Sequence, residues 1–538
     1  MNTTTIINAK VYTVAPANPQ AEAVLIVGNQ IAFVGSNEDA LAQRTPQTRV
    51  IDAGGCTLMP GIHDAHYHLL MGSERLEHLN LEAVTSLDQL AAMIRQSDGG
   101  NEWIQGNGLA YDVVGANIPL TRHHLDAIEP NRPIHLIGID FHTSWANTKA
   151  LEIAGILHGG EARRPGSEIL RDVDGIATGQ INEDFTLMDR YIPQPSQAAL
   201  RTLVKRAIAD MNALGITSVT NMDGSPEQIA LYADMAANNE FNLRVQVPYS
   251  ITPKTQVEDI VAEAVPMRAQ YSTGKVAGKV ASKVRAGSVK LFIDGVIESG
   301  TAYMLEPYTR WPDSCGTPLY EWAHYRDLIV EADKHGFQVK VHAIGDAGVR
   351  MTLDAYEAAQ RANGVRDSRH RIEHIETLHN DDLPRFAQLG VIASMQPLHV
   401  SRPADDYYVN WMHCIGAERY HRAFRMRELR EQGVSLAFGS DWPVVSYDPY
   451  IGISAALRLT SWGEGMRHQA QTLTEAIDGY TQTAAYAEFQ EHVKGQIKVG
   501  MLADLVLLDC DLFAKDADEI PAVRPLMTIC DGEVVYER

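Results

Sequence analysis

The sequence predicts an α/β protein built around a distorted (β/α)8 barrel. Seven short apolar segments alternate with helix-like segments through the middle of the chain, and an eighth apolar segment precedes them. Histidine, lysine and aspartate residues occur at the ends of several of these segments. A closed barrel needs eight parallel strands alternating with helices, and its active site lies at the carboxyl ends of the strands. The pattern therefore predicts both the fold and the face that carries the chemistry.

Both ends of the chain are predicted to form strands of a smaller β-domain. Short β-branched segments occur near the amino terminus at 6–12, 23–27 and 30–34. Segments of the same character occur near the carboxyl terminus at 503–509, 525–530 and 533–536. Asn, Asp and Gly residues between some of them are typical of tight turns. We therefore expect residues 1–58 and 489–538 to form one composite β-domain.

The barrel is expected to begin at 59–71 and to continue through 201–488. Its first strand precedes His66, and the other seven are expected at 216–220, 243–247, 288–293, 338–342, 371–374, 391–395 and 435–439. Residues 72–200 interrupt the alternation and are richer in proline, glycine and charge. We interpret 72–200 as an insertion after the first barrel strand.

Composition narrows the classes of function. The chain has 538 residues, of which 45% are hydrophobic and 21% charged, as expected of a soluble globular protein. Its net charge of -22 argues against nucleic acid and membrane surfaces as partners. The five cysteines are scattered, and residues 1–8 lack the pattern of a signal peptide. We therefore expect a cytoplasmic protein.

The residues that end the first predicted barrel strand indicate a metal site. His66 and His68 are two residues apart, and alternate residues of an extended strand point to the same side. Both imidazoles can therefore reach one ion, and histidine is the commonest metal ligand in proteins. A chance pair among the 20 histidines of the chain is the alternative interpretation.

Four further strand ends favour the metal site over a chance pair. Side chains of the types found at metal sites occur in the fourth, fifth and sixth predicted strands and just after the eighth: Lys290, His342, His374 and Asp441. Because the carboxyl ends of barrel strands converge on one face, we expect these side chains to meet His66 and His68 there.

At these positions the chain resembles the amidohydrolase superfamily, and more narrowly its amidohydrolase-3, or YtcJ-like, branch, which includes the N-substituted formamide deformylases. The resemblance is carried by 60–68, 289–295, 341–346, 371–374, 394–399, 439–443 and 500–506. It implies that the composite β-domain is a β-sandwich and that the protein assembles as a homodimer.

The resemblance also implies roles for the six site residues. His66 and His68 would bind one divalent metal ion together with Asp441. Lys290 would be carboxylated by CO2, and its carbamate would bind or bridge the metal. His342 and His374 would serve a second ion; with a single ion, one of them would bind it and the other would act on the substrate. Zinc is the expected metal, as one or two ions. The alternatives are a paired structural lysine for Lys290 and a helix N-cap for Asp441, although a cap and a ligand are compatible.

The implied reaction is hydrolysis by metal-activated water. Asp441 would accept the proton of the water and return it to the leaving nitrogen, with His342 and His374 beside it as catalytic residues. His63 and Asp64 are expected to brace the two metal-binding histidines. His399 is expected to be an ordinary loop residue, with a place in the pocket as the alternative. Candidates for contacting the substrate flank the strand ends or match segments of the branch: His142, Glu183, Asp294, Glu298, Gln396 and Trp442.

We therefore predict a metal-dependent hydrolase that cleaves a non-peptide C–N bond of a small molecule. N-substituted formamides and N-acyl amines are the leading substrate class. The alternatives on the same site are hydrolysis of a cyclic amide or carbamate, deamination, and hydrolysis of an ester or lactone. Lys290 disfavours deamination, because deaminases of the superfamily generally lack a lysine there. A non-catalytic barrel scaffold is a further alternative, and the filled ligand positions argue against it.

Overall fold

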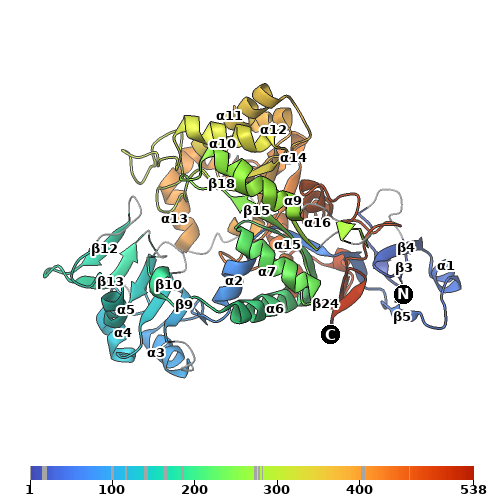
Figure 1. Ribbon diagram of the computed structural model, residues 1–538, viewed down its shortest axis with the longest axis horizontal. Helices are drawn as coiled ribbons and strands as arrows, with labels where there is room; N and C mark the ends of the chain where they lie inside the picture. Colours follow the sequence, from blue (N-terminus) through green and yellow to red (C-terminus); the bar gives the residue numbers. More distant parts are fainter. Residues whose placement is uncertain are drawn as a thin grey trace. The chain divides into compact units, whose positions relative to one another are not determined.

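The computed structural model describes residues 2–14, 21–97, 102–115, 118–138, 143–160, 167–182, 184, 187–271, 275–276, 279–280, 283–400, 406–459, 461–463 and 465–538. Two compact units make up the chain, one from residues 1–69 and 205–538 and the other from residues 70–204 (Figure 1). Within the described ranges, no helix is both long enough and apolar enough to cross a lipid bilayer.

Eight parallel strands form a nearly closed barrel in the first unit, as the sequence predicts. They pair in chain order: β7 (Ile62–Tyr67), β14 (Ile216–Asn221), β15 (Arg244–Ser250), β18 (Val284–Phe292), β19 (Gln338–Ala343), β20 (Arg371–His374), β21 (Ile392–Met395) and β22 (Leu436–Phe438). A parallel bridge between Tyr67 and Trp442 brings the two ends of the sheet together. Six of these strands are buried at every residue, although β7, β14, β19 and β20 also carry polar or charged side chains.

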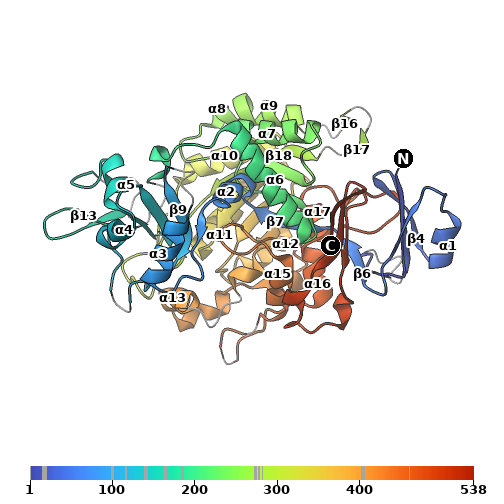
Figure 2. The ribbon, with the colours of Figure 1, turned by 90° about the horizontal axis from the view of Figure 1, so that it is seen from below.

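Helices separate the barrel strands (Figure 2). Ser225 begins one of them, because its side chain accepts a hydrogen bond from the backbone N–H of Gln228 and Pro226 occupies the first turn. The helices of this part of the chain are α6 (Gln197–Ala213), α7 (Pro226–Ala237), α8 (Val257–Asp259), α9 (Val265–Tyr271), α10 (Trp322–Lys334), α11 (Asp346–Asn363), α12 (Leu383–Leu389), α13 (Asp406–Ile415), α14 (Met426–Glu431), α15 (Pro449–Leu457), α16 (Leu473–Gly479) and α17 (Gln482–Ala487).

Strands from both chain ends form the composite β-domain, as predicted. One sheet has the order β4 (Gln30–Gly35), β3 (Ala23–Val27), β1 (Thr3–Ile7) and β5 (Arg49–Asp52). The other has the order β2 (Lys10–Val11), β6 (Thr57–Pro60), β23 (Leu505–Leu508), β24 (Pro525–Cys530) and β25 (Glu533–Glu537). The antiparallel pairing of β6 with β23 joins the two ends of the chain. Side chains from both sheets share one apolar core, among them Val24, Ile31, Leu58 and Leu505.

The strand-like segment 6–12 is divided between β1 and β2. Two strands occupy this segment, because Asn8 between them has a left-handed backbone with φ of +55°. Asn8 is hydrogen-bonded to Asn37 and Asp52, and these contacts hold the bend. Asparagine tolerates this conformation better than most residues, so the bend is compatible with the sequence.

The second unit is the insertion that follows the first barrel strand. It spans residues 70–204, against an expected 72–200. Its six-stranded sheet has the order β12 (Glu168–Arg171), β13 (Ala177–Asn182), β11 (Thr143–Ala146), β10 (Ile134–Gly138), β9 (Ile104–Leu109) and β8 (Leu79–Asn80). The accompanying helices are α2 (Leu69–Arg75), α3 (Leu87–Gln96), α4 (Arg122–Ile128) and α5 (Thr148–Ile153). Apolar side chains such as Leu136 and Trp145 give this unit a core of its own.

Candidate metal centre

The six predicted site residues lie at or near the carboxyl ends of barrel strands. His66 is in β7 and His68 follows it, Lys290 is in β18, His342 is in β19, His374 ends β20, and Asp441 follows β22. All six side chains are buried. The barrel therefore gathers them on the face where enzymes of this fold carry out their chemistry.

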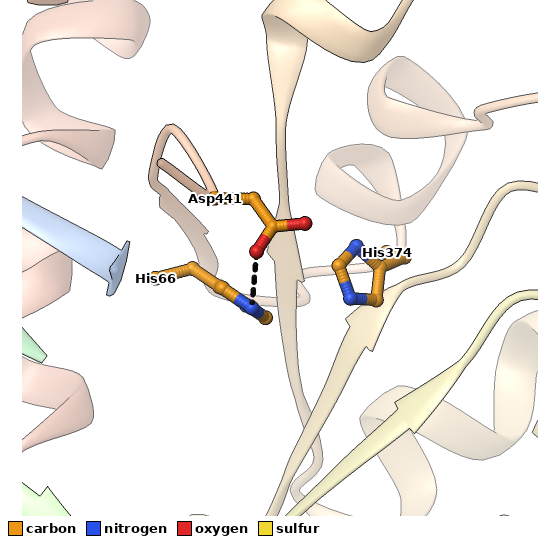
Figure 3. A group of neighbouring side chains, drawn as sticks. All are labelled: His66, His374 and Asp441. Atoms are coloured by element: carbon orange, nitrogen blue, oxygen red, sulfur yellow. Dashed lines mark ion pairs between the residues drawn. The ribbon is translucent and has the colours of Figure 1, made fainter. Parts of the chain in front are cut away.

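Two histidines and one aspartate meet at the centre of this face. The Asp441 Oδ1 atom lies 3.2 Å from His66 Nε2 and 3.1 Å from His68 Nε2. One ligand atom from each of His66, His374 and Asp441 lies within 4.8 Å of the other two (Figure 3). Imidazole nitrogens and a carboxylate oxygen are the donors that zinc and similar divalent ions take, so the residues fit a metal ion.

His342 and Lys290 extend the group on the side of β18 and β19. The His342 and His374 ring centroids are 4.5 Å apart. Lys290 is 1% exposed, and its Nζ atom has no hydrogen-bond partner among the described residues. The Phe292 ring lies 4.3 Å from that nitrogen. A buried amine without a partner is unfavourable, and the formation of a metal-binding carbamate would relieve the cost.

The backbone around Asp441 is held in an unusual conformation. Asp441 has φ of +63° and His374 has φ of +76°, and this left-handed region is uncommon for residues other than glycine. The Asp441 backbone N–H donates to the His66 carbonyl oxygen at 2.7 Å, which ties the loop after β22 to β7. A Cβ atom at Gly439 would lie 2.3 Å from the His66 backbone nitrogen, so only glycine permits this approach.

Asp441 is not a helix cap. The next helix, α15, begins eight residues later at Pro449, and Asp448 caps it by accepting a hydrogen bond from the Tyr450 N–H. The segment between Asp441 and Asp448 is not helical, so the N-cap interpretation is wrong.

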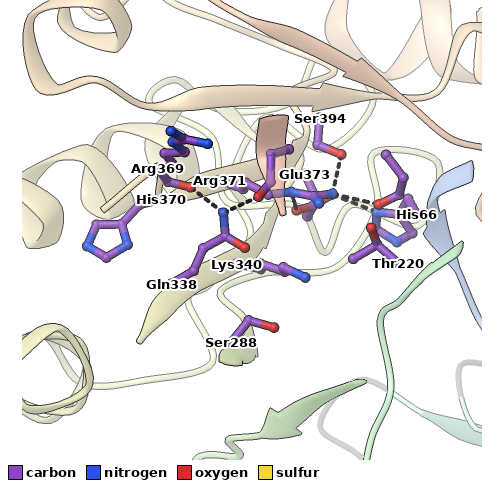
Figure 4. Close-up of polar contacts among 12 residues, drawn as sticks. His66, Thr220, Ser288, Gln338, Lys340, Arg369, His370, Arg371, Glu373 and Ser394 are labelled. Atoms are coloured by element: carbon purple, nitrogen blue, oxygen red, sulfur yellow. Dashed lines mark hydrogen bonds and ion pairs between the residues drawn. The ribbon is translucent and has the colours of Figure 1, made fainter. Parts of the chain in front are cut away.

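Carboxylates hold the outer nitrogens of the two histidines. His66 Nδ1 lies 2.8 Å from Glu373 Oε2, and His68 Nδ1 lies 2.9 Å from Asp223 Oδ1. Arg371 donates to both Glu373 oxygens at 2.9 Å, and also to the Ser394 hydroxyl (Figure 4). Such partners fix the tautomer and the orientation of a metal-binding imidazole.

The expected bracing residues divide into two kinds. The Asp64 carboxylate accepts hydrogen bonds from the backbone N–H groups of His66 and Ser440, so it braces the site as expected. His63 instead contacts the Thr220 hydroxyl and Glu488, and not the outer nitrogens of His66 and His68.

Residues 49–536 match the sequence model of the amidohydrolase family. The chain belongs to this family. YtcJ of Bacillus subtilis (strain 168) is 29% identical over 98% of this chain and 98% of that protein. The N-substituted formamide deformylase of Arthrobacter pascens is 28% identical over 99% of this chain and 98% of that enzyme. The structure of an uncharacterized metal-dependent hydrolase from Pyrococcus furiosus covers 96% of this chain and 99% of its own, with 25% identity and a TM-score of 0.75. Together these matches support a metal-dependent hydrolase.

In this amidohydrolase the charge states of Asp441, His342, His374 and Lys290 suit metal binding. His68 differs, because burial would lower its pKa but Asp223 and Asp441 outweigh burial and raise the pKa to about 9, so a metal ion there would displace a proton. Burial would raise the pKa of Asp441, but His66 and His68 outweigh it and hold the pKa well below the usual range. Burial lowers the pKa of His342 to about 3 and that of His374 well below its usual value, so both imidazoles are neutral. Burial also lowers the pKa of Lys290 to about 8, which raises the neutral fraction of the amine. Carboxylate and neutral imidazole are the forms that bind metal ions.

The predicted substrate residues have different surroundings. Asp294 accepts backbone hydrogen bonds from Tyr303, Ile344 and Gly345 and lies 3.7 Å from His342 Nε2, and burial raises its pKa to about 7. It therefore holds loops together next to the site. Gln396 is 2% exposed, and among the described residues neither of its side-chain polar atoms has a partner.

For the remaining candidates, the structure gives fewer contacts that would place them at the site. Trp442 stacks on Tyr67 with 5.1 Å between ring centroids, and Glu298 is half-buried. His142 and Glu183 lie outside the described residues. Substrate contact by all six candidates stays a prediction.

Sequence reasoning missed three acidic residues and misjudged one histidine. Glu373, Asp223 and Glu376 were not identified, and His399 was expected to be a loop residue. His399 lies in a short 3-10 helix after β21 (η3, Pro397–His399), and its ring stacks on His374 with 5.9 Å between centroids. A signal in the sequence could have found Glu373. It is two residues from Arg371 in a predicted strand, so the two side chains lie on the same face and can pair.

Proposed function

We propose that this protein is a metal-dependent hydrolase of a non-peptide amide bond in a small molecule, with N-substituted formamides and N-acyl amines as substrate class. The observation that carries the proposal is the meeting of His66, His68 and Asp441 within about hydrogen-bonding distance, with His374 beside them at the carboxyl face of the barrel. The full-length match to a formamide deformylase favours an acyl-nitrogen substrate.

The proposed metal ligands are His66, His68 and Asp441, together with His342, His374 and a carbamate on Lys290. When bound, one or two divalent ions would polarise the scissile carbonyl and lower the pKa of the attacking water. Zinc is the proposed metal, because the donors are nitrogen and oxygen atoms of histidine and carboxylate.

Asp441 is the proposed proton carrier. Its Oδ1 atom faces His66 and His68, whereas its Oδ2 atom lies on the side of His399. The Oδ2 atom is therefore available to accept a proton from the attacking water and to return it to the leaving nitrogen. The low pKa of Asp441 keeps it ionised before the reaction, as a proton acceptor must be.

The test is hydrolysis of matched substrates by the metal-loaded protein. We expect release of amine from N-substituted formamides or from N-acyl amines, and loss of this activity in Asp441→Asn with the fold intact by circular dichroism. Esters with the same acyl group and the same substituent distinguish amide from ester preference. Hydrolysis of the esters alone would contradict the amide assignment, and activity retained in Asp441→Asn would contradict its role.

A further inference from the structure

His399 lies beside the proposed proton carrier on the side opposite the two metal-binding histidines. Its Nε2 atom is 3.8 Å from Asp441 Oδ2, while Asp441 Oδ1 faces His66 and His68. The His399 ring is nearly parallel to that of His374, with an interplanar angle of 10°. The imidazole therefore borders the reacting centre, although the proposed ligand set leaves it out.

The Nε2 atom of His399 has no hydrogen-bond partner within the described part of the chain. A separation of 3.8 Å from Asp441 Oδ2 is too long for a hydrogen bond, and the side chain is only 12% exposed. A nearly buried polar nitrogen without a partner is costly, so a partner supplied from outside the chain would stabilise it.

The other ring nitrogen of His399 faces a second carboxylate. His399 Nδ1 is 3.9 Å from Glu376 Oε1, and Trp411 holds the Glu376 side chain by donating from Nε1 to Oε2 at 2.8 Å. The ring thus lies between Asp441 and Glu376, and a hydrogen atom on Nε2 would point toward Asp441 Oδ2.

We propose that His399 is a catalytic residue whose Nε2–H donates a hydrogen bond to the carbonyl oxygen of the scissile amide. The inference rests on the proposed function. The gap between His399 and Asp441 is shorter than two hydrogen bonds of about 3 Å laid end to end. A carbonyl oxygen bound to His399 Nε2 and a water bound to Asp441 Oδ2 can therefore be neighbours, which allows the water to approach the carbonyl carbon. The carbonyl oxygen gains negative charge in the transition state, so the donor acts most strongly there.

The test compares His399→Ala and His399→Asn with wild type and with His421→Ala, a control at an exposed histidine. We expect kcat of His399→Ala to fall by about 100-fold to 1,000-fold, with KM changed little. His399→Asn should recover part of the loss, because its amide N–H can donate. Metal content by elemental analysis should match wild type in both variants, since His399 is not a ligand.

Two results would overturn the assignment. Loss of metal from a folded His399→Ala protein would show that His399 binds the metal or supports a residue that does. A kcat of His399→Ala within about threefold of the wild-type value would show that His399 has no role in catalysis. If His399→Ala does not fold, His399→Asn and His399→Gln decide the question by the same readouts.

Failure of the proposed function would give results that differ from those of a failed His399 assignment. In that case wild type hydrolyses none of the amides, so Asp441→Asn has no amide hydrolysis to lose. The affinity of the metal-loaded protein for acetate, measured by calorimetry, then tests His399 by itself. We expect weaker acetate binding in His399→Ala than in His421→Ala, and equal affinity would overturn the inference.

Discussion

Glu373 shows how a single buried residue can set the properties of the site. Its carboxylate is fully buried, takes two hydrogen bonds from Arg371 and faces the outer nitrogen of His66. Arg371 also donates to the Ala65 carbonyl oxygen, so the guanidinium links β20 to β7 next to the proposed metal ligands. The orientation of His66 is thereby built into the barrel interior. His68 has a looser support, because the side chain of its partner Asp223 is 37% exposed.

Glu373→Gln is expected to weaken metal binding by about 10-fold to 100-fold, because an amide holds the His66 imidazole less firmly than a carboxylate does. Competition with a chelator of known affinity measures the effect. Asp223→Asn is the matched control on His68, and we expect a smaller loss because solvent already reaches Asp223. Equal metal affinity in wild type and Glu373→Gln would contradict the role given to Glu373.

Lys290→Ala is expected to lose metal and activity together, because the variant cannot form the proposed carbamate. Short-chain carboxylates such as acetate should restore part of both, since they can occupy the space of the missing side chain and supply an anionic oxygen. Metal content and turnover are measured with and without the added acid. A Lys290→Ala protein that keeps its full metal content would rule the carbamate out.

At the scale of elements, the close contact between β22 and β7 decides where Asp441 lies. Gly439 follows β22 directly, and the backbone of His66 occupies the space that a side chain at 439 would need. The Asp441 N–H then bonds to the His66 carbonyl oxygen and the His68 N–H to the Trp442 carbonyl oxygen. The site thus depends on one tight strand contact at the closure of the barrel.

Gly439→Ala is therefore expected to lower the free energy of unfolding by about 1–3 kcal/mol and to reduce metal content, since the added methyl group must push β7 and β22 apart. Gly287→Ala is the matched control in β18, because a Cβ atom there would meet nothing within 4 Å. Thermal unfolding and elemental analysis check the two effects. A Gly439→Ala protein as stable and as metal-rich as Gly287→Ala would show that the contact does not position the site.

At the scale of the whole molecule, the barrel and the composite β-domain are joined by buried charge. Arg244 in β15 donates to the Asp504 carboxylate at 2.6 Å and to Asp531 at 2.8 Å, and both acids lie in the carboxyl-terminal segment of the chain. Arg244 and Asp504 are almost completely buried. The last strands of the chain are therefore tied to the barrel as well as to β6.

Much of this architecture could be predicted from the sequence because parallel strands buried on both faces leave long apolar segments. Barrel strands such as β21 and β22 stood out in this way, and His342 and His374 could be placed at the ends of predicted strands. Other features depend on contacts between distant segments. The left-handed turn at Asn8, the backbone of Asp441 and the place of His399 beside it follow from how strands pack, which no local pattern records. Glu373 was predictable only in part, because the sequence indicated its position in a strand but not its contact with His66.

The most direct test of the account is the metal content of wild-type protein purified without chelator. Elemental analysis should find one or two divalent ions per chain, and the Asp441→Asn variant should hold less. Two ions would fit a carbamate on Lys290 that bridges them, and one ion would assign His342 or His374 to the substrate. A protein that holds no metal, and that takes up none from added zinc, manganese or cobalt, would contradict the metal centre and with it the proposed hydrolysis.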